Sequence, residues 1–380
     1  MDLTECRNRI DEIDRQLVAL FSERMETAAQ IAAYKKEHRL PVLDAERERQ
    51  KLRQIAELAP EALQDDAETL YRLLFELSRS YQRRLLGSVS PLPGEIRQAI
   101  ERTPELFPVR ATIACQGVEG AYSQLACGRL FRTPDIFYFS NFEAVFAAVD
   151  KGLCRYGVIP LENSAAGSVN AVYDLMMRYN FRIVRSVRLK VDHNLLALPG
   201  ATLGGIREIY SHEQAISQCS RLLQSMPNVK VVRCANTAEA AKFVADSGRT
   251  DVAALASRSC ANLYELNVLS ASVQDQGSNF TRFICISKEL EIYPGADRTS
   301  LMMTLPHKPG ALSRVLSRFY ALGVNLNKLE SRPLPDRNFE FMFYFDLECP
   351  VYAPQFLQLM GELEEISENC SYLGSYSEVV

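Results

Sequence analysis

The stretch LTECRNRIDEIDRQLVAL, residues 3–20, decides the fold of the N-terminal part of the chain. Its apolar residues recur at alternating spacings of three and four, which is typical of an α-helix with one buried seam. The seam consists of Leu3, Cys6, Ile10, Ile13, Leu17 and Leu20. Because no glycine occurs before Gly87, residues 1–87 are predicted to form an all-helical module of three helices.

Basic residues continue this seam where apolar ones are expected. One turn beyond Leu20 the line reaches Arg24, and Lys35 follows eleven residues, or about three turns, later. Arg7 flanks the seam nearer its start. These positions direct positive charge towards the interior of the predicted bundle.

The other two predicted helices add polar residues to the same interior. The second should begin near Asp44, a suitable N-cap, and brings Arg47 and Glu48 to its apolar stripe. The third carries Ser78 and Gln82, one turn apart on one face. One carboxylate cannot balance four cations, and an unpaired buried cation costs several kcal/mol. We therefore favour a small polyanionic ligand here, although the alternative is that the basic side chains extend to surface salt bridges.

The length and composition limit the classes of protein to which the chain can belong. At 380 residues it should hold two or three domains, and 47% apolar with 24% charged residues exclude disordered and fibrous classes. The formal net charge of −4 argues against a nucleic-acid partner. No apolar stretch reaches the ~18–20 residues of a membrane span, and residues 1–9 carry no apolar signal core. We expect a cytoplasmic protein.

The cysteines and histidines do not suggest a metal. The ten cysteines include no Cys-x-x-Cys pair, and the four histidines are scattered. Neither a metal site nor a cofactor is predicted. The cysteines are expected to be thiols in a reducing compartment.

Changes in proline content and in the pattern of apolar residues divide the chain further. Residues 88–109 are rich in proline and are interpreted as a linker, with space for a short helix. Short apolar runs alternate with helical stretches over 110–290, which favours an α/β domain. Residues 298–380 have the order βαββαβ of the ferredoxin-like motif, an α+β fold. The prediction is a multidomain protein.

Four polar segments of the central domain are candidates for a cleft: residues 117–123, 160–168, 210–212 and 279–283. The first follows a strand and precedes a helix, where backbone N–H groups can bind an anion. Polar residues after a buried strand, as in the second, often line ligand clefts. Ser211 is expected to cap a helix, and Ser211 and His212 are adjacent, which disfavours a catalytic Ser–His pair. Taken singly, each segment is equally compatible with an ordinary turn or strand edge.

The N-terminal pattern resembles the active site of the all-helical chorismate mutases. The matching residues are Arg7, Arg24, Lys35, Asp44, Arg47, Glu48, Ser78 and Gln82. The resemblance implies that the two arginines Arg7 and Arg24 bind carboxylates of chorismate, that Lys35 and Gln82 donate to its ether oxygen, and that Glu48 accepts from its ring hydroxyl. It also implies a homodimer through the helical module, with Arg7 supplied by the partner chain.

The central segments together resemble prephenate dehydratase, which implies a bilobal fold like that of periplasmic binding proteins, with prephenate in the cleft. The family's essential threonine corresponds to Thr281. The other expected cleft residues are Glu162, Asn163, Ser164, Ser211, Gln218, Arg282 and Phe283. The chain departs from the family at Ala121, which replaces a Ser or Thr, and at Ser164, which replaces a Thr.

The C-terminal domain resembles the amino-acid-binding ACT domain. The motifs that carry the resemblance are Pro309, Gly310, Ala311 and Leu312 at a helix start, and Glu330 with Ser331 at a strand end. It implies that phenylalanine binds between two such domains as an effector; whether phenylalanine also drives higher oligomers is left open by the sequence.

The leading interpretation is a bifunctional enzyme of phenylalanine biosynthesis, regulated by phenylalanine. One alternative is a dehydratase whose helical module only dimerises, and another is a non-catalytic bilobal amino-acid sensor. The set from Arg7 to Gln82 counts against the first, and Thr281 with Glu162 and Asn163 counts against the second.

Overall fold

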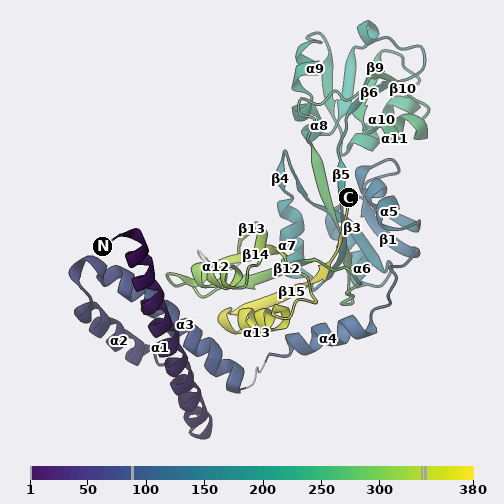
Figure 1. The fold of residues 1–380 in the computed structure, drawn as a ribbon. Helices are drawn as coiled ribbons and strands as arrows, with labels where there is room; N and C mark the ends of the chain where they lie inside the picture. The colour runs from purple at the N-terminus through teal and green to yellow at the C-terminus, as the bar shows by residue number, and fades with distance from the viewer. Residues whose placement is uncertain (1, 87–89, 335–336, 338–339) are drawn as a thin grey trace. The chain divides into compact units, whose positions relative to one another are not determined.

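A computed structural model describes residues 2–86, 90–334, 337 and 340–380. The chain forms two compact units, Met1–Pro91 and Leu92–Val380. Figure 1 shows the helices of the first unit and the mixed architecture of the second. The predicted domain boundary at residues 87 and 88 lies outside the described residues.

The first unit consists of three α-helices, α1 (Leu3–Glu37), α2 (Ala45–Leu58) and α3 (Gln64–Leu86), as predicted. Asp2 caps α1 by accepting a hydrogen bond from the Glu5 amide, and the Glu5 carboxylate accepts one from the Asp2 amide. The Asp44 carboxylate caps α2 through the Arg47 amide, at 2.9 Å. Each cap supplies an acceptor to an amide that has no partner within its helix, which favours these helix starts.

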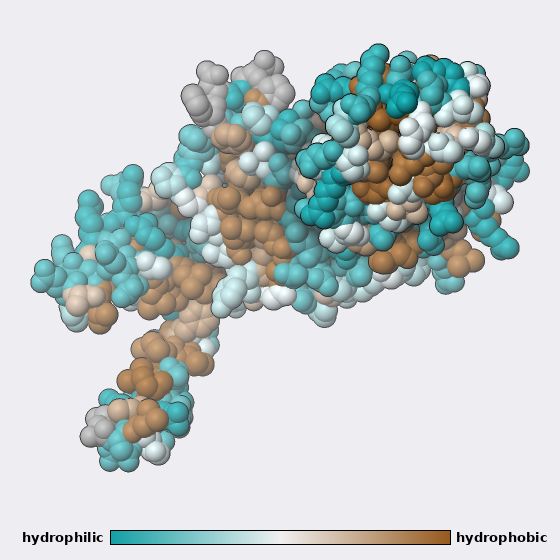
Figure 2. All heavy atoms as spheres, turned by 90° about the horizontal axis from the view of Figure 1, so that it is seen from above, coloured by the Kyte–Doolittle hydropathy of each residue, from teal (hydrophilic) through white to brown (hydrophobic). Residues whose placement is uncertain are grey.

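The apolar seam of α1, predicted to be buried, is exposed in the single chain. Leu3 is 67% exposed, Leu17 55% and Leu20 62%, whereas only Ala28 and Ala32 of this 35-residue helix are buried. Figure 2 shows that hydrophobic side chains reach the surface in patches between hydrophilic areas. A three-helix unit of this size has too little interior to cover so long a helix.

The segment expected to be a linker contains a packed helix. Helix α4 (Leu92–Arg102) buries Leu92, Ile96 and Ala99 in the same hydrophobic core as helices α12 (Ala311–Ala321) and α13 (Phe356–Ile366). Its apolar residues recur every three to four positions, so one face is shielded by the C-terminal domain. Most of residues 88–109 therefore belongs to the second unit.

The first lobe of the second unit is built on a mixed sheet in the order β16-β5-β11-β3-β1-β2, with β4 paired to β3. Its strands are β1 (Arg110–Gln116), β2 (Thr133–Phe139), β3 (Tyr156–Asn163), β4 (Gly167–Ser168), β5 (Arg182–Lys190), β11 (Phe280–Ser287) and β16 (Glu378–Val379). Helices α5 (Tyr122–Leu130), α6 (Phe142–Asp150) and α7 (Asn170–Arg178) accompany it.

The second lobe holds a five-stranded sheet in the order β10-β6-β9-β7-β8 and lies at the top of Figure 1. Its strands are β6 (Asn194–Ala197), β7 (Glu208–Ser211), β8 (Lys230–Arg233), β9 (Val252–Ala256) and β10 (Asn267–Ser270). Its helices are α8 (Glu213–Gln218), α9 (Ser220–Gln224), α10 (Thr237–Asp246) and α11 (Arg258–Leu263). The predicted bilobal α/β architecture is confirmed.

A β-bulge interrupts the pairing of β3 with β11. Phe283 pairs with Pro160 and Arg282 with Glu162, so Leu161 is the extra residue. Thr281 then pairs with Asn163. Because of the extra residue, the side chains of β3 that follow the bulge point to the opposite face from the one that regular alternation would give them. Thus Asn163 lies on the same face as Thr281, and Glu162 on the same face as Arg282.

The C-terminal domain has the predicted ferredoxin-like order and an antiparallel sheet, β13-β14-β12-β15. Its strands are β12 (Arg298–Thr304), β13 (Asn325–Pro333), β14 (Phe341–Glu348) and β15 (Asn369–Tyr376). One sheet face packs on α12 and α13 through residues such as Phe345. The other packs on the first lobe through residues such as Tyr344, and β16 then joins the first lobe's sheet.

Candidate active sites

A cavity of about 640 Å³ lies within the helical unit. Five basic side chains line it: Arg24, Lys35, Arg47, Lys51 and Arg79. Three carboxylates line it as well, those of Glu23, Asp44 and Glu48. The lining therefore carries two excess positive charges, which suits a dianion of small size. Seven of the eight residues predicted for this site are among its lining residues.

Arg24 is held in place on the cavity wall. Its guanidinium donates to the Leu74 carbonyl at 3.1 Å and to the Ser78 hydroxyl, and it lies 5.8 Å from the centre of the Phe75 ring. Burial lowers the pKa of Arg24 from its ordinary value. The charge is thus incompletely solvated, and an anion in the cavity would stabilise it.

Lys35 and Gln82 retain hydrogen-bonding capacity at the same cavity. The Lys35 ammonium donates to the Val42 carbonyl at 2.6 Å, which uses one of its three donor hydrogens. Gln82 is 7% exposed, and its side-chain oxygen has no hydrogen-bond partner. An unpaired buried polar atom is costly, so this amide is suited to a bound ligand or to reorientation on binding.

Arg79 is a lining residue that the sequence patterns missed. It forms an ion pair with Glu48, and the two side chains are 15% and 27% exposed. Arg79 directly follows Ser78 on α3, but its pairing with Glu48 joins two helices, so no pattern along a single helix could have identified it. Asp44 serves as the N-cap of α2, and the Arg47 guanidinium donates to Gln50 at 3.1 Å.

Arg7 is the predicted residue that the cavity does not contain. It precedes Arg24 by 17 positions on the same helix, which corresponds to about 25 Å of axial rise. No rotamer of Arg7 spans that distance. Within one chain, the cavity therefore lacks this arginine.

A second cavity, of about 510 Å³, lies between the two lobes of the second unit. Of the predicted cleft residues, Asn163, Gln218, Thr281 and Phe283 line it, together with Ala121. Asn163 and Thr281 stand at the adjacent ends of β3 and β11. The carboxyl ends of sheet strands are a common place for ligand sites in α/β domains.

The hydrogen bonds around Asn163 show that the Thr281 hydroxyl accepts from Asn163 and does not donate to it. The Asn163 oxygen accepts from the Ala165 and Ala166 amides at 3.0 and 2.8 Å, which fixes the side-chain nitrogen on the other side. That nitrogen donates to the Asn279 oxygen at 2.7 Å and to the Thr281 hydroxyl oxygen at 2.9 Å. Thr281 accepts at its oxygen, so its own hydrogen remains available for a ligand in the cleft.

The same chain of hydrogen bonds continues to Asn279, which lies in the candidate segment 279–283, and to His193, which the sequence patterns did not identify. Asn279 donates to the Gln218 oxygen at 2.9 Å, and the ring Nε2 of His193 lies 3.1 Å from that oxygen. Because the Gln218 oxygen can only accept, His193 Nε2 carries a hydrogen. Burial lowers the pKa of His193, which favours the neutral ring.

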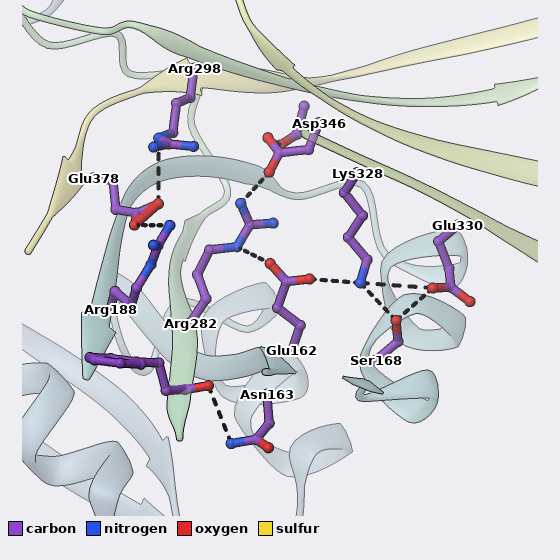
Figure 3. Close-up of polar contacts among 12 residues, drawn as sticks. Glu162, Asn163, Ser168, Arg188, Arg282, Arg298, Lys328, Glu330, Asp346 and Glu378 are labelled. Atoms are coloured by element: carbon purple, nitrogen blue, oxygen red, sulfur yellow. Dashed lines mark hydrogen bonds and ion pairs between the residues drawn. The ribbon is translucent and has the colours of Figure 1, made fainter. Parts of the chain in front are cut away.

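Glu162 and Arg282 do not line the cleft, contrary to the prediction. They lie on the opposite face of β3 and β11, where Figure 3 shows them between the first lobe and the C-terminal domain. Arg282 contacts Glu162 at 2.9 Å and forms a second ion pair with Asp346 of β14. Burial raises the pKa of Glu162, but Arg282 and Lys328 outweigh it and hold the value below its ordinary range.

Two predicted serines also lie elsewhere. Ser211 is fully buried at the end of β7, where its hydroxyl donates to the Leu255 carbonyl at 2.7 Å. His212, not Ser211, caps α8, accepting from the Gln214 amide at 3.3 Å. Ser164 donates to the Ser278 carbonyl and accepts from the Phe280 amide, so it fastens the start of β11.

Ala121 occupies the N-cap position of α5 with no side-chain hydrogen bond, and it lines the cleft. The start of α5 therefore lines the cavity without a capping hydroxyl at position 121. The segment 117–123, predicted from its glycines, contributes Ala121, Tyr122 and Ser123 to the lining. Position 121 is one of the two places, with Ser164, where this chain differs from the expected family pattern.

In the C-terminal domain, Gly310 precedes α12 with φ of 78°, a left-handed conformation that favours glycine. Pro309, Ala311 and Leu312 surround it at this helix start. Ser331 pairs with Phe343 and thus shares the helix-covered face of the sheet. Glu330 pairs with Tyr344 on the opposite face and accepts from Ser168 of the first lobe at 2.5 Å. The strand therefore separates Glu330 from the other predicted effector residues.

No group of three metal-ligating side chains occurs in the part of the chain that the structure describes. Across the same residues, no helix is both long and apolar enough to cross a bilayer.

Three family models match the chain in order: chorismate mutase type II at residues 6–83, prephenate dehydratase at 113–291 and the ACT domain at 299–365. The bifunctional chorismate mutase/prephenate dehydratase of Aquifex aeolicus is 30% identical over 100% of this chain and 99% of its own length. The Escherichia coli K12 protein of that description is 31% identical over 98% and 96%.

Solved structures match the second unit. Prephenate dehydratase from Arthrobacter aurescens, determined in complex with L-Phe, has a TM-score of 0.64 and 28% identity, covering 70% of this chain and 89% of its own. A structure described as GqqA, a quorum quenching acylase, also has a TM-score of 0.64, with 33% identity over 70% of this chain and 98% of its own.

Proposed function

The chain belongs to the bifunctional chorismate mutase/prephenate dehydratase family, and from this membership we propose how its residues divide the work. It is an enzyme of phenylalanine biosynthesis with both activities: it rearranges chorismate to prephenate, and converts prephenate to phenylpyruvate by loss of carbon dioxide and the ring hydroxyl. The residue assignments below are proposals.

The helical cavity is the proposed mutase site, and its excess positive charge carries this assignment. Chorismate is a dianion, and its rearrangement needs no nucleophile but requires the two parts of the substrate to be held together. Arg24 binds one carboxylate, and Lys35 with Gln82 stabilises negative charge developing on the ether oxygen. The Glu48 carboxylate, oriented by Arg79, accepts from the ring hydroxyl.

Arg7 completes this site from a second copy of the chain in our proposal. Support comes from its ~25 Å separation from Arg24 along α1 and from the exposed apolar seam around it. The seam gives the homodimer its interface, because a covered apolar stripe of this length is far more stable than an exposed one.

Subunit mixing tests this arrangement. Arg7→Ala and Arg24→Ala homodimers should both lack mutase activity. Unfolding and refolding the two together should restore about a quarter of wild-type activity, because half of the dimers are mixed and each mixed dimer holds one intact site. If mixing restores nothing while mixed dimers form, Arg7 does not act across the interface.

The interlobe cleft is the proposed dehydratase site, and the hydrogen bond that Thr281 accepts from Asn163 in the cleft lining is the observation that carries it. Departure of the ring hydroxyl of prephenate requires a hydrogen bond or proton in the transition state. Asn163 donates to Thr281, so the threonine can donate to the departing hydroxyl. Phe283 supplies an apolar wall, which favours loss of a carboxylate as neutral carbon dioxide.

Phenylalanine is the proposed effector of the C-terminal domain. The start of α12 at Gly310 offers amide groups for its carboxylate, and Ser331 lies on the same sheet face. Calorimetric titration of phenylalanine into Ser331→Ala and Gly310→Ala proteins should show weaker binding than wild type. Unchanged affinity and unchanged inhibition in both would refute this site. Sedimentation with and without saturating phenylalanine measures whether the effector produces an assembly larger than the dimer.

We also propose that the protein works in the cytoplasm. All ten cysteines are free thiols, seven of them buried, as expected for a protein in a reducing compartment.

A further inference from the structure

Two neighbouring strands of the first lobe connect the cleft to the C-terminal domain. Strand β11 places Thr281 in the cleft and the next residue, Arg282, on the opposite face. Strand β3 does the same with Asn163 and Glu162. Successive side chains of a strand point to opposite faces, so each cleft residue is one peptide unit from a residue that contacts the C-terminal domain.

The contacts on that opposite face form a chain of buried ions. Arg282 is 5% exposed and lies between Glu162, at 2.9 Å, and Asp346, which is fully buried (Figure 3). Glu162 also contacts Lys328 of β13 at 2.7 Å. Residues of the C-terminal domain thus hold both ends of the pair formed by Glu162 and Arg282.

Asp346 cannot follow Arg282 freely, because its own domain holds it. Its other carboxylate oxygen accepts from the Ser300 hydroxyl at 3.2 Å and from the Tyr376 hydroxyl at 3.3 Å. A buried ion pair tolerates separation poorly, since each charge left unpaired is strongly destabilising. A displacement of β14 must therefore either move Arg282 or break this pair.

We infer that Arg282 is a positioning residue for the dehydratase reaction: anchored by Asp346, it sets the position of Thr281 and transmits movements of the C-terminal domain to the cleft. The regulatory half of this inference rests on the proposed function, in which phenylalanine binds that domain. Arg282 touches no substrate in this arrangement and acts through the strand that carries Thr281.

Asp346→Asn tests the inference in the full chain. The substitution keeps the shape of the side chain but removes the anion through which the C-terminal domain holds Arg282. We expect the dehydratase kcat to fall between about tenfold and 100-fold, because a displacement of 1 Å at a reacting group has effects of that size. The KM for prephenate should change little, and phenylalanine should bind but no longer inhibit. The mutase activity of the same chain reports the amount of folded enzyme.

Asp174→Asn is the matched control. Asp174, on α7, pairs with Arg332 of β13 at 2.9 Å, so it also joins the first lobe to the C-terminal domain, but its helix carries neither Asn163 nor Thr281. This variant should keep the wild-type kcat and its inhibition. An equal loss in both variants would show that any contact between the domains matters equally, which overturns a special role for Arg282.

A double variant separates coupling from stability. Replacing a buried ion pair by apolar side chains often preserves or increases stability, so Arg282→Met with Asp346→Leu should unfold near the wild-type midpoint. We expect this protein to bind phenylalanine and remain uninhibited. Full inhibition in the double variant would refute the inference. If wild-type protein itself fails to bind phenylalanine, the effector proposal fails instead, and the kcat comparison of Asp346→Asn with Asp174→Asn still decides the role of Arg282.

Discussion

At the scale of single residues, the direction of one hydrogen bond distinguishes an active cleft from an inactive one. Asn163→Asp would replace the donor to Thr281 by a carboxylate, which accepts the threonine hydrogen and turns it away from the ligand. We expect dehydratase kcat to fall by about 10²–10³, the usual effect of losing one transition-state donor. Steady-state assays with prephenate measure it, and mutase activity should be unchanged. Thr281→Ser, which keeps the hydroxyl, should retain most turnover. Comparable activity in Asn163→Asp and wild type would contradict the assigned direction.

His193 makes the stability of the second unit depend on pH. Its pKa is lowered in the folded protein from the ordinary 6.5, so the unfolded chain binds the proton more readily. The resulting stabilisation is complete above pH ~6.5 and is lost as the pH falls below that value. His193→Gln keeps a donor towards Gln218 but does not titrate. Urea unfolding between about pH 5 and 8 should give this variant a shallower loss of stability than wild type.

The matched control is His307→Gln, at an exposed histidine. It should reproduce the wild-type pH dependence. Identical slopes for wild type and His193→Gln would mean that this ring is not the titrating group.

Site residues could be predicted where a charge interrupts an apolar stripe. They could not be predicted where a residue reaches the site only through its contact with another helix. Arg24 and Lys35 stand on the seam of α1, so their periodicity was sufficient to place them at the cavity. Arg79 reaches the cavity only because α3 packs beside α2, and its pairing with Glu48 is a tertiary contact. His193 was missed for the same reason, since three separate segments assemble its hydrogen-bond chain with Gln218 and Asn279.

At the scale of elements, β15 and β5 approach so closely that only glycine fits between them. A β-carbon at Gly374 would lie 2.4 Å from the Ile183 carbonyl oxygen, and the residue has φ of 138°. Gly374→Ala should therefore lower the free energy of unfolding of the second unit by about 2 kcal/mol or more. Urea unfolding, followed by tyrosine fluorescence because the chain has no tryptophan, measures the change.

Gly94→Ala is the control for this substitution. A β-carbon there has open space within α4, and alanine favours a helix over glycine by about 0.5–1 kcal/mol. This variant should be slightly more stable than wild type. If both alanines had the same effect, the steric explanation for Gly374 would be wrong.

The existence of β3 and β11 could be predicted, but not which of their side chains face the cleft. Apolar runs and turn residues indicated β3 and β11, and the polar residues after them indicated a cleft. The prediction then assigned the neighbours Glu162 and Asn163, and likewise Thr281 and Arg282, to one cleft, which alternation along a strand does not allow. The bulge at Leu161 decides which member of the β3 pair enters the cleft, and a bulge depends on the pairing with the partner strand.

At the scale of the whole molecule, the exposed seam of α1 predicts that the enzyme is a dimer in solution. Leu17→Glu places a charge on the seam, at a position where the side chain is 55% exposed in the single chain. We expect sedimentation to show dissociation to monomers at micromolar concentration, with loss of mutase activity, because the partner no longer supplies Arg7. Dehydratase activity should persist.

Gln16→Glu is the matched control for this substitution, since it adds the same charge one residue away and off the seam. It should remain a dimer with both activities. If Leu17→Glu stayed dimeric and active, the interface would have to lie elsewhere on the molecule.

The bulge in β3 limits where insertions and deletions can occur in this protein family. Deleting or inserting a single residue between Pro160 and Asn163 would exchange inward and outward side chains at the strand end, sending the amide of Asn163 away from the substrate and a carboxylate towards it. Natural variants of this enzyme should therefore accumulate gaps in the connecting loops and almost never within these four positions.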